Sequence, residues 1–359
     1  MKKNENYYVA IMAGGVGSRF WPASRESLPK QFLDIIGVGK SLIRLTYERF
    51  RKILPPENIL VVTNKAYKDL VAEHIPEIPE ANIITEPSRN NTGPCVAYTA
   101  LRLKAVNPEA CFVIAPSDHI ILKETLFCEK ILQALDYASR HPAILTLGIQ
   151  PTRPDTGYGY IESDNTEVEA GIEQVASFKE KPDKETAEYY LSQNKYYWNA
   201  GIFVWSVKTI EAAFKTNAPD IIEILNAEPE KYNTSEEQDY IDRVYPQTPS
   251  ISVDYAILEK ADNVYTLPVD IGWSDLGTWN ALYAFLDKDN DQNVVIGDQT
   301  LLINSHDCIV RTDAQKLVVI KGLEDYIVID EKDVLLIYPK SEEQAIKQLR
   351  KSIDKAEFL

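Results

Sequence analysis

The stretch that decides the fold is "YYVAIMAGGVGSRFWPASRESLPKQF" (7–32), in which an apolar run meets a cluster of glycines. The run Tyr7–Ala13 has the length and apolar character of a buried strand. Gly14, Gly15 and Gly17 follow it, and glycines at the end of a strand let backbone amides approach a phosphate closely. The pattern therefore predicts an anion-binding loop directly after a strand.

This loop matches neither of two common phosphate-binding motifs. No Gly-Lys-Ser/Thr follows at P-loop spacing, and Phe20 stands where a dinucleotide-binding motif has its third glycine. Pro22 and Pro29 also disfavour a long helix starting directly after the glycines. We therefore expect Arg19 and Lys30 to hold the outer phosphates of a nucleoside triphosphate. A plain turn with surface cations is the alternative that these residues leave open.

The first half of the chain alternates short apolar runs with amphipathic segments. Strands are predicted at 7–13, 59–63, 82–85, 111–115 and 143–149, and helices at 41–54, 92–106 and 124–140. This alternation is typical of a parallel sheet with crossover helices. The predicted fold class is α/β, with a Rossmann-like, mostly parallel sheet whose ligands bind beyond the carboxyl ends of its strands.

A polar, Asp-rich segment at 287–293 divides the chain. Six short strand-like runs follow between 294 and 339, and a final helix is predicted over 341–358. Evenly spaced strands without helices indicate a small sheet, barrel or β-helix. We predict one domain over 1–287 and a small C-terminal β-domain with a terminal helix over 288–359. The second is expected to serve assembly or stability rather than chemistry.

Composition narrows the possible partners and location. The formal net charge of -16 argues against a nucleic-acid or anionic-membrane surface. The N-terminus lacks the longer apolar run of a signal peptide, and no run is long enough for a membrane span. The four cysteines have no metal-ligand spacing and are expected to be reduced core thiols. We expect a cytoplasmic protein that binds neither nucleic acid nor membrane.

Eight motifs then point to a family. They are "MAGGVGSRFWPASRESLPKQF" (12–32), "EPSRNNTGP" (86–94), "APSDH" (115–119), "TGYGYI" (156–161), "KEKP" (179–182), "WNAGIF" (198–203), "SVDYAILEK" (252–260) and "GWSDLGTW" (272–279). In this order they resemble the sugar-1-phosphate nucleotidyltransferases. The Trp-Pro-x-Ser-Arg inside the first motif is similar to the mannose-1-phosphate guanylyltransferase branch.

The resemblance implies a fold, a reaction and a form of the protein. The fold is of the nucleotide-diphospho-sugar transferase type, with 1–287 as the catalytic domain and a short left-handed β-helix in the C-terminal domain. The implied reaction converts GTP and α-D-mannose 1-phosphate to GDP-mannose and diphosphate, by Mg²⁺-assisted in-line attack of the sugar phosphate on the α-phosphorus. A homodimer is expected. The chain ends where bifunctional relatives would continue into an isomerase domain, so a monofunctional form is implied.

The resemblance also implies site residues. Catalytic roles fall to Arg19, Lys30 and Lys181. The residues implied to bind the sugar phosphate are Gly157, Glu162, Lys181 and Asn199, and those implied to bind the metal are Asp118 and Asp275. The nucleotide is expected to contact Gly14, Gly15, Gly17, Ser18, Arg19, Lys30, Glu86, Asn91, Thr92 and Asp118.

Without the family resemblance, three of these residues could have ordinary structural roles instead of functional ones. Asp118 and Asp275 each follow a strand-like run, where an aspartate often caps a helix or forms a turn. Two carboxylates from distant strands nevertheless suit Mg²⁺, which takes few protein ligands when substrate phosphates supply the rest. Lys181 could be a solvated lysine beside Pro182. His119 is expected to be a positioning residue rather than a general base.

One position departs from the family pattern, and rival functions remain. Asn90 stands where relatives commonly have arginine, and the arginine lies one position earlier, as Arg89. Because this segment helps to recognise the base in relatives, a uridylyl- or thymidylyltransferase is the nearest rival. A non-catalytic paralogue that binds nucleotide sugar is a second rival, and an NAD-dependent dehydrogenase a third.

Overall fold

The structure is a computed structural model that describes residues 4–312, 316–355 and 358. The chain forms two compact units, and neither is continuous in sequence. The first unit contains Met1–Gly14, Tyr47–Pro116 and Ile121–Trp273. The second contains Gly15–Thr46, Ser117–Ile120 and Ser274–Leu359. The glycine-rich loop after the first strand and the C-terminal strands therefore belong to one unit.

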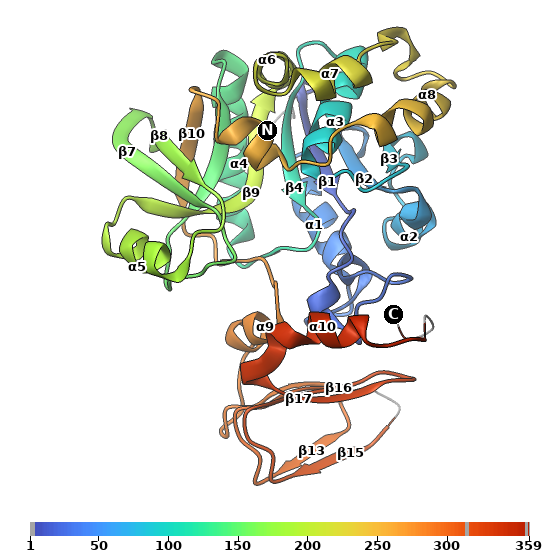
Figure 1. The fold of residues 1–359 in the computed structure, drawn as a ribbon, viewed down its shortest axis with the longest axis vertical. Coiled ribbons are helices and arrows are strands. Elements are labelled where there is room, and N and C mark those ends of the chain that lie inside the picture. The colour runs from blue at the N-terminus through green and yellow to red at the C-terminus, as the bar shows by residue number, and fades with distance from the viewer. Residues whose placement is uncertain (1–3, 313–315, 356–357, 359) are drawn as a thin grey trace. The chain divides into compact units, whose positions relative to one another are not determined.

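A nine-stranded mixed sheet forms the centre of the first unit (Figure 1), in the order β3-β2-β1-β4-β9-β6-β10-β8-β7. Strand β1 is parallel to β2 and β4, β2 to β3, and β6 to β10. Strand β9 runs antiparallel between β4 and β6. The strands are β1 (Tyr7–Met12), β2 (Ile59–Asn64), β3 (Ile83–Glu86), β4 (Cys111–Pro116), β6 (Ile144–Ile149), β7 (Tyr160–Glu169), β8 (Ile172–Lys179), β9 (Tyr196–Ser206) and β10 (Val264–Val269).

Helices cover both faces of this sheet, which explains why its central strands are apolar throughout. Buried residues of α3, α6 and α7 form one core cluster with alternate residues of the strands. Helix α4 packs against β4, β6 and β9 on the other face. The helices are α2 (Lys68–His74), α3 (Thr92–Val106), α4 (Glu124–Arg140), α5 (Lys184–Ser192), α6 (Val207–Asn217), α7 (Pro219–Leu225) and α8 (Glu237–Val244).

The second unit is built on two small parallel sheets. Strands β12, β14 and β16 pair in parallel, with β17 antiparallel at the edge, and β13 pairs in parallel with β15. This alternation of strands between two sheets is the arrangement of a β-helix-like domain. The elements are β12 (Val294–Ile296), β13 (Thr300–Ile303), β14 (Ile309–Arg311), β15 (Val318–Lys321), β16 (Tyr326–Asp330), β17 (Leu335–Pro339), α9 (Trp279–Phe285) and α10 (Ile346–Lys351).

Some elements are short or cross between the units along the chain. The chain passes from one unit to the other at five points, and three of these lie within helix α1 (Leu42–Arg51) and the two-residue strands β5 (Ile120–Ile121) and β11 (Trp273–Ser274). A π-helical turn covers Asp254–Leu258. Short 3₁₀ turns occupy Ser18–Phe20, Lys30–Phe32, Pro56–Asn58, Lys65–Tyr67, Glu80–Asn82, Pro229–Lys231, Tyr245–Gln247 and Lys340–Ala345.

One hydrophobic core joins the N-terminal arm to the C-terminal strands within the second unit. Phe20 and Trp21 pack in the same cluster as Trp279, Leu336 and Ile346. The Phe20 and Trp279 rings lie 4.8 Å apart between centroids. The arm that follows the glycines is therefore held by residues that lie more than 250 positions later in the sequence.

The predicted α/β class, parallel strands and C-terminal β-region are confirmed. Each of the five predicted strands matches an observed strand to within about one residue at either end. The final helix differs, because Lys340–Ala345 is 3₁₀, the α-helix covers only Ile346–Lys351, and residues 356, 357 and 359 lie outside the described residues. The boundary between 287 and 288 stays a prediction.

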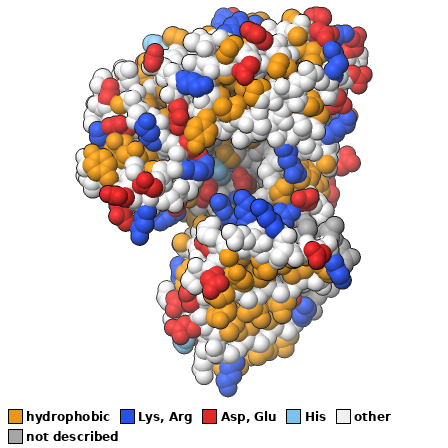
Figure 2. All heavy atoms as spheres, in the orientation of Figure 1, with side chains coloured by type: hydrophobic (Ala, Val, Ile, Leu, Met, Phe, Trp, Pro, Cys, Tyr) orange, Lys and Arg blue, Asp and Glu red, His pale blue; other side chains and the backbone are white. Residues whose placement is uncertain are grey.

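Two further features of the described residues matter later. No helix among them is both long and apolar enough to cross a membrane. All four cysteines are buried and free, with Cys95, Cys111 and Cys128 in the first unit and Cys308 in the second. Figure 2 shows hydrophobic side chains gathered over the C-terminal strands, and the exposed ones are Val295, Leu301, Ile303, Leu317, Val319, Leu335 and Ile337.

Candidate active site

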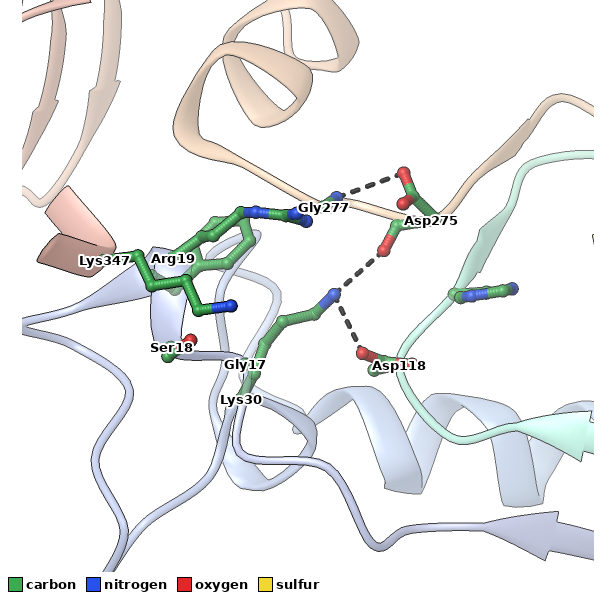
Figure 3. A pocket seen from close by; sticks show the side chains of 10 residues that line it. Gly17, Ser18, Arg19, Lys30, Asp118, Asp275, Gly277 and Lys347 are labelled. Atoms are coloured by element: carbon green, nitrogen blue, oxygen red, sulfur yellow. Dashed lines mark hydrogen bonds and ion pairs between the residues drawn. The ribbon is translucent and has the colours of Figure 1, made fainter. Parts of the chain in front are cut away.

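The second unit contains a pocket of about 340 Å³ (Figure 3), a size that suits a small ligand. Three separate segments of the chain bring six predicted site residues to its wall, namely Gly17, Ser18, Arg19, Lys30, Asp118 and Asp275. Four residues that were not predicted as site residues also line it, namely Phe20, His119, Gly277 and Lys347. Of these, His119 was expected to be a positioning residue, and Phe20 was noted only as the residue that replaces a third glycine.

The conformation of Gly17 brings the glycine loop against Lys30. Gly17 has φ 72°, a left-handed conformation that glycine adopts without steric cost. A Cβ at this position would lie 2.5 Å from the Cβ of Lys30, too close for any side chain. The Lys30 amide donates to the carbonyl oxygen of Val16 at 3.2 Å. Gln31 Nε2 donates to the carbonyl oxygen of Gly15 at 2.9 Å, which fixes the loop further.

The buried Lys30 ammonium joins the two segments that carry the predicted metal ligands. It lies 2.9 Å from the Asp118 carboxylate and donates to the carbonyl oxygens of Asp275 and Leu276, each at 2.8 Å. Burial raises the pKa of Asp118, but the Lys30 ammonium and His119 lower it by more, so the net shift is downward. Asp118 is thus held as a carboxylate beside a cation.

The turn Asp275–Leu276–Gly277 is strained and is not a helix cap. Leu276 is buried with φ 43°, a conformation that costs a non-glycine residue about 1 to 3 kcal/mol. A Cβ on Gly277 would lie 2.7 Å from an Asp275 carboxylate oxygen, and the Gly277 amide donates to that carboxylate at 3.1 Å. The following helix α9 is capped by Thr278, whose hydroxyl accepts from the Ala281 amide. The capping alternative for Asp275 is therefore wrong.

A second group of predicted residues lies in the first unit, around Lys181 and Asn199. Lys181 has φ 48° and pairs with the carboxylate of Glu180, whose side chain is only 8% exposed. Asn199 Nδ2 donates to Asp254 at 3.1 Å, and its Oδ1 accepts from Thr146 at 3.1 Å. Burial, followed by the negative charge of Glu180, raises the pKa of Asp254 to about 6. Buried carboxylates and an amide of this kind can hold the hydroxyls of a sugar.

Glu180 and Asp254 were not predicted as site residues, although both lie inside quoted motifs. Asp254 begins the π-helical turn, a rare element that is frequent at functional sites. A Cβ on Gly159 would lie 2.5 Å from a Glu180 carboxylate oxygen and 3.5 Å from the Asn199 Cβ, so Gly159 separates these two side chains. The only sequence signal for these two residues is that they are acidic and lie inside the motifs. Their burial, which makes them candidates for the site, cannot be read from residue type.

Two predicted sugar-phosphate residues have other partners. Glu162 accepts from Lys195 at 2.5 Å and from the Ser177 hydroxyl at 2.8 Å. The exposed Gly157 amide donates to the Asp155 carboxylate at 2.8 Å. Within the described parts of the chain, neither makes a hydrogen bond to Lys181 or Asn199.

A third group lies near the start of α3. Glu86 accepts a hydrogen bond from the Tyr245 hydroxyl. Burial raises the pKa of Glu86 to about 7, against the opposing effect of its hydrogen bonds. A Cβ on Gly14 would lie 3.7 Å from the other Glu86 carboxylate oxygen. Asn91 caps α3 by accepting from the Thr92 amide at 2.9 Å.

The same segment explains the departure at Asn90. Asn90 Nδ2 donates to the carbonyl oxygens of Tyr245 and Thr248 at 3.1 and 2.9 Å, and to the Thr248 hydroxyl at 3.0 Å. Arg89 donates instead to the Tyr67 hydroxyl at 2.6 Å and lies over its ring. Asn90 therefore holds the turn at 245–248 against the 86–94 segment through its side-chain amide.

Comparisons with known proteins show the family to which the chain belongs. A family model described as "Nucleotidyl transferase" matches residues 8–292, and one described as "MannoseP isomerase/GMP-like beta-helix domain" matches residues 298–352. The chain is 36% identical over 345 residues to the mannose-1-phosphate guanylyltransferase of Klebsiella pneumoniae, covering 94% of this chain and 72% of that protein. It is 34% identical over 350 residues to the alginate biosynthesis protein AlgA of Pseudomonas aeruginosa, covering 96% and 71%.

The fold has a close match among solved structures. A crystal structure described as mannose-1-phosphate geranyltransferase from Thermus thermophilus superposes with a TM-score of 0.87 at 29% identity. The match covers 98% of this chain and 100% of that one.

Proposed function

The chain belongs to the nucleotidyl transferase family, among the mannose-1-phosphate guanylyltransferases, and we propose that it converts GTP and mannose 1-phosphate to GDP-mannose and diphosphate. The observation that carries the proposal is the pocket in which Arg19, Lys30, Asp118 and Asp275 meet. Two cations and two carboxylates around one small pocket suit a triphosphate that binds with a divalent cation.

The proposed reaction needs no nucleophile from the protein. An anionic oxygen of mannose 1-phosphate forms a bond to the α-phosphorus of GTP, and the bond to the diphosphate oxygen breaks. The protein must position the phosphates and neutralise their charge. We assign Arg19 and Lys30 to the triphosphate, with the backbone of Gly15, Gly17 and Ser18. Lys181 is assigned to the sugar phosphate.

The residues present fit the proposed Mg²⁺. Asp118 and Asp275 line one pocket, and a cation, the Lys30 ammonium, already lies on the Asp118 carboxylate. Two carboxylates completed by substrate phosphates are a usual site for this ion. When bound, Mg²⁺ would neutralise phosphate oxygens and align the reacting groups. The described residues contain no cluster of three or more acidic, histidine or cysteine ligands, so most of its ligands would come from substrate and water.

The sugar and the base are assigned to the first unit. We propose that Glu180, Asn199 and Asp254 accept or donate hydrogen bonds to sugar hydroxyls. Glu162 and Gly157 are retained as sugar-phosphate candidates, although their present partners give them less support. Gly14, Glu86, Asn91 and Thr92 are proposed to contact the nucleotide.

A homodimer and a cytoplasmic location complete the proposal. The exposed aliphatic side chains on the C-terminal strands support a surface for a second copy, because contiguous exposed apolar patches often mark protein–protein interaction sites. The four free thiols support a reducing compartment. Sedimentation at several protein concentrations would test the dimer, and a monomer at micromolar concentration would contradict it.

A substrate grid tests the function. Diphosphate release should be measured for GTP, ATP, UTP and dTTP, each with mannose 1-phosphate, glucose 1-phosphate and galactose 1-phosphate. We expect GTP with mannose 1-phosphate to give the highest kcat/KM. A preference for UTP or dTTP would instead favour the uridylyl- or thymidylyltransferase alternative. Binding without turnover for every pair would favour the non-catalytic paralogue.

A further inference from the structure

The terminal helix α10 contributes one side chain, Lys347, to the wall of the phosphate pocket. Lys347 lines this pocket together with Ser18, Arg19 and Lys30. Figure 3 shows its side chain reaching from the helix toward Ser18 and Arg19, on the side away from Asp118 and Asp275. This residue lies in the C-terminal β-region, which the sequence had suggested serves assembly or stability rather than chemistry.

Helix α10 is held in place by contacts around Lys347. Its neighbour Ile346 is fully buried in the core that contains Phe20 and Trp21. Arg350 Nη2 donates to the Glu26 carboxylate at 3.1 Å, one turn further along. Because these residues join the helix to the arm that carries Arg19, the position of Lys347 at the pocket is set by packing.

The charges at the pocket indicate what Lys347 is for. Within the described part of the chain, neither Arg19 nor Lys347 makes a hydrogen bond or an ion pair with another side chain. Two unpaired cations on one wall repel each other, and an anion between them would remove that repulsion. Elsewhere in the same unit, Arg25, Lys340 and Arg350 pair with Asp333, Asp325 and Glu26.

We propose that Lys347 is a further phosphate ligand, and that with Arg19 it holds the two outer phosphates of the triphosphate, which leave as diphosphate. The inference rests on the proposed function, whose triphosphate occupies the same pocket. Three Lys or Arg side chains line the pocket, and Lys30 is already engaged by Asp118 and two carbonyl oxygens. Arg19 therefore keeps its expected role at the outer phosphates, and Lys347 replaces Lys30 there, which leaves Lys30 for the rest of the triphosphate. The C-terminal helix is then part of the active site.

The test measures binding of inorganic pyrophosphate with Mg²⁺ to the full chain by isothermal titration calorimetry. We expect Lys347→Met to weaken binding about 10-fold or more, the usual effect of losing a charged hydrogen bond. Lys347→Arg, which keeps the charge, should stay within about threefold of the wild type. The matched control is Lys351→Met, because Lys351 is exposed on the same helix but does not line the pocket. It should bind like the wild type.

Steady-state kinetics supply a second readout. In Lys347→Met the KM for GTP should rise about as much as the Kd for pyrophosphate, while the KM for mannose 1-phosphate stays within about twofold. The proposal is overturned by wild-type pyrophosphate affinity in Lys347→Met, by an equal loss in Lys351→Met, or by a wild-type protein that does not bind pyrophosphate. A failed substrate grid with the expected pyrophosphate series would overturn only the proposed substrates.

Discussion

The ion pair between Lys30 and Asp118 gives the sharpest prediction about the pocket. Its two charges lie 2.9 Å apart, so their gross attraction is about 6 kcal/mol at an effective dielectric constant of 20. The Lys30 side chain is only 4% exposed and has lost most of its hydration, which offsets much of that attraction. The Asp118 side chain is 31% exposed and is partly screened by water. We therefore expect a net coupling of about 1 to 3 kcal/mol.

A double-mutant cycle measures this coupling directly. The free energy of unfolding is obtained by urea denaturation at pH 7, without nucleotide or metal, for the wild type, Lys30→Met, Asp118→Asn and the double variant. Each single variant should be destabilised, and the double variant should be less destabilised than the sum of the two. A coupling below about 0.5 kcal/mol would refute the reasoning, because the pair would then be no stronger than an exposed one.

The pH dependence of the coupling shows whether any group other than Asp118 and Lys30 contributes to it. The folded-state pKa of Asp118 lies below the ordinary value of 3.8, so the carboxylate form is favoured in the folded protein. The stabilisation is then fully present above pH 3.8 and is lost as the pH falls through the lower folded-state value. We expect the same coupling at pH 6 and pH 8. A coupling that changes between these two values would mean that another group titrates with the pair.

Three more predictions concern other residues of the candidate site. Gly17→Ala should lower the free energy of unfolding by about 2 to 5 kcal/mol in urea, since φ is 72° and the new Cβ would lie 2.5 Å from that of Lys30. Gly15→Ala is the control, because a Cβ there meets nothing within 4 Å, and equal losses would contradict the explanation. The pKa of Glu86 is raised from 4.5 to about 7, so the folded state holds the proton more tightly and loses stability as the pH rises through this range. Glu86→Gln should therefore gain about 3 kcal/mol relative to the wild type between pH 4.5 and pH 8 in pH-dependent denaturation, and a constant difference would show that Glu86 does not titrate there. Lys181→Ala should raise the KM for mannose 1-phosphate about 10-fold and that for GTP much less, whereas a selective loss of GTP affinity would mean that the lysine is misassigned.

The parallel part of the sheet could be predicted because its strands are continuous apolar runs between amphipathic helices. Strand β9 could not be placed in the same way, although its sequence, "YYWNAGIFVWS", is clearly apolar. Its antiparallel position between β4 and β6 depends on which strands pair, and residue types do not encode the pairing partner.

The quoted motifs contain nine of the ten residues that line the pocket, and Lys347 is the one that they do not contain. Arg19, Lys30, Asp118 and Asp275 stand in motifs whose glycines and spacing are specific, and the structure brings these four together. Lys347 is one of two lysines on the short helix α10, and nothing in its sequence neighbourhood distinguishes it as a site residue. Its position depends on the packing of Ile346 with residues from the other end of the chain, which is visible only in three dimensions.

The placement of the four cysteines has a practical consequence for following local opening. Three of the thiols belong to the first unit, and Cys308 alone reports on the second. A buried thiol reacts with an alkylating reagent only when its surroundings open, so its labelling rate measures the free energy of that opening. Mass spectrometry of the labelled peptides would therefore follow the two units separately in the unmodified protein. Added nucleotide should slow the labelling of Cys308 if it stabilises the unit that contains the pocket.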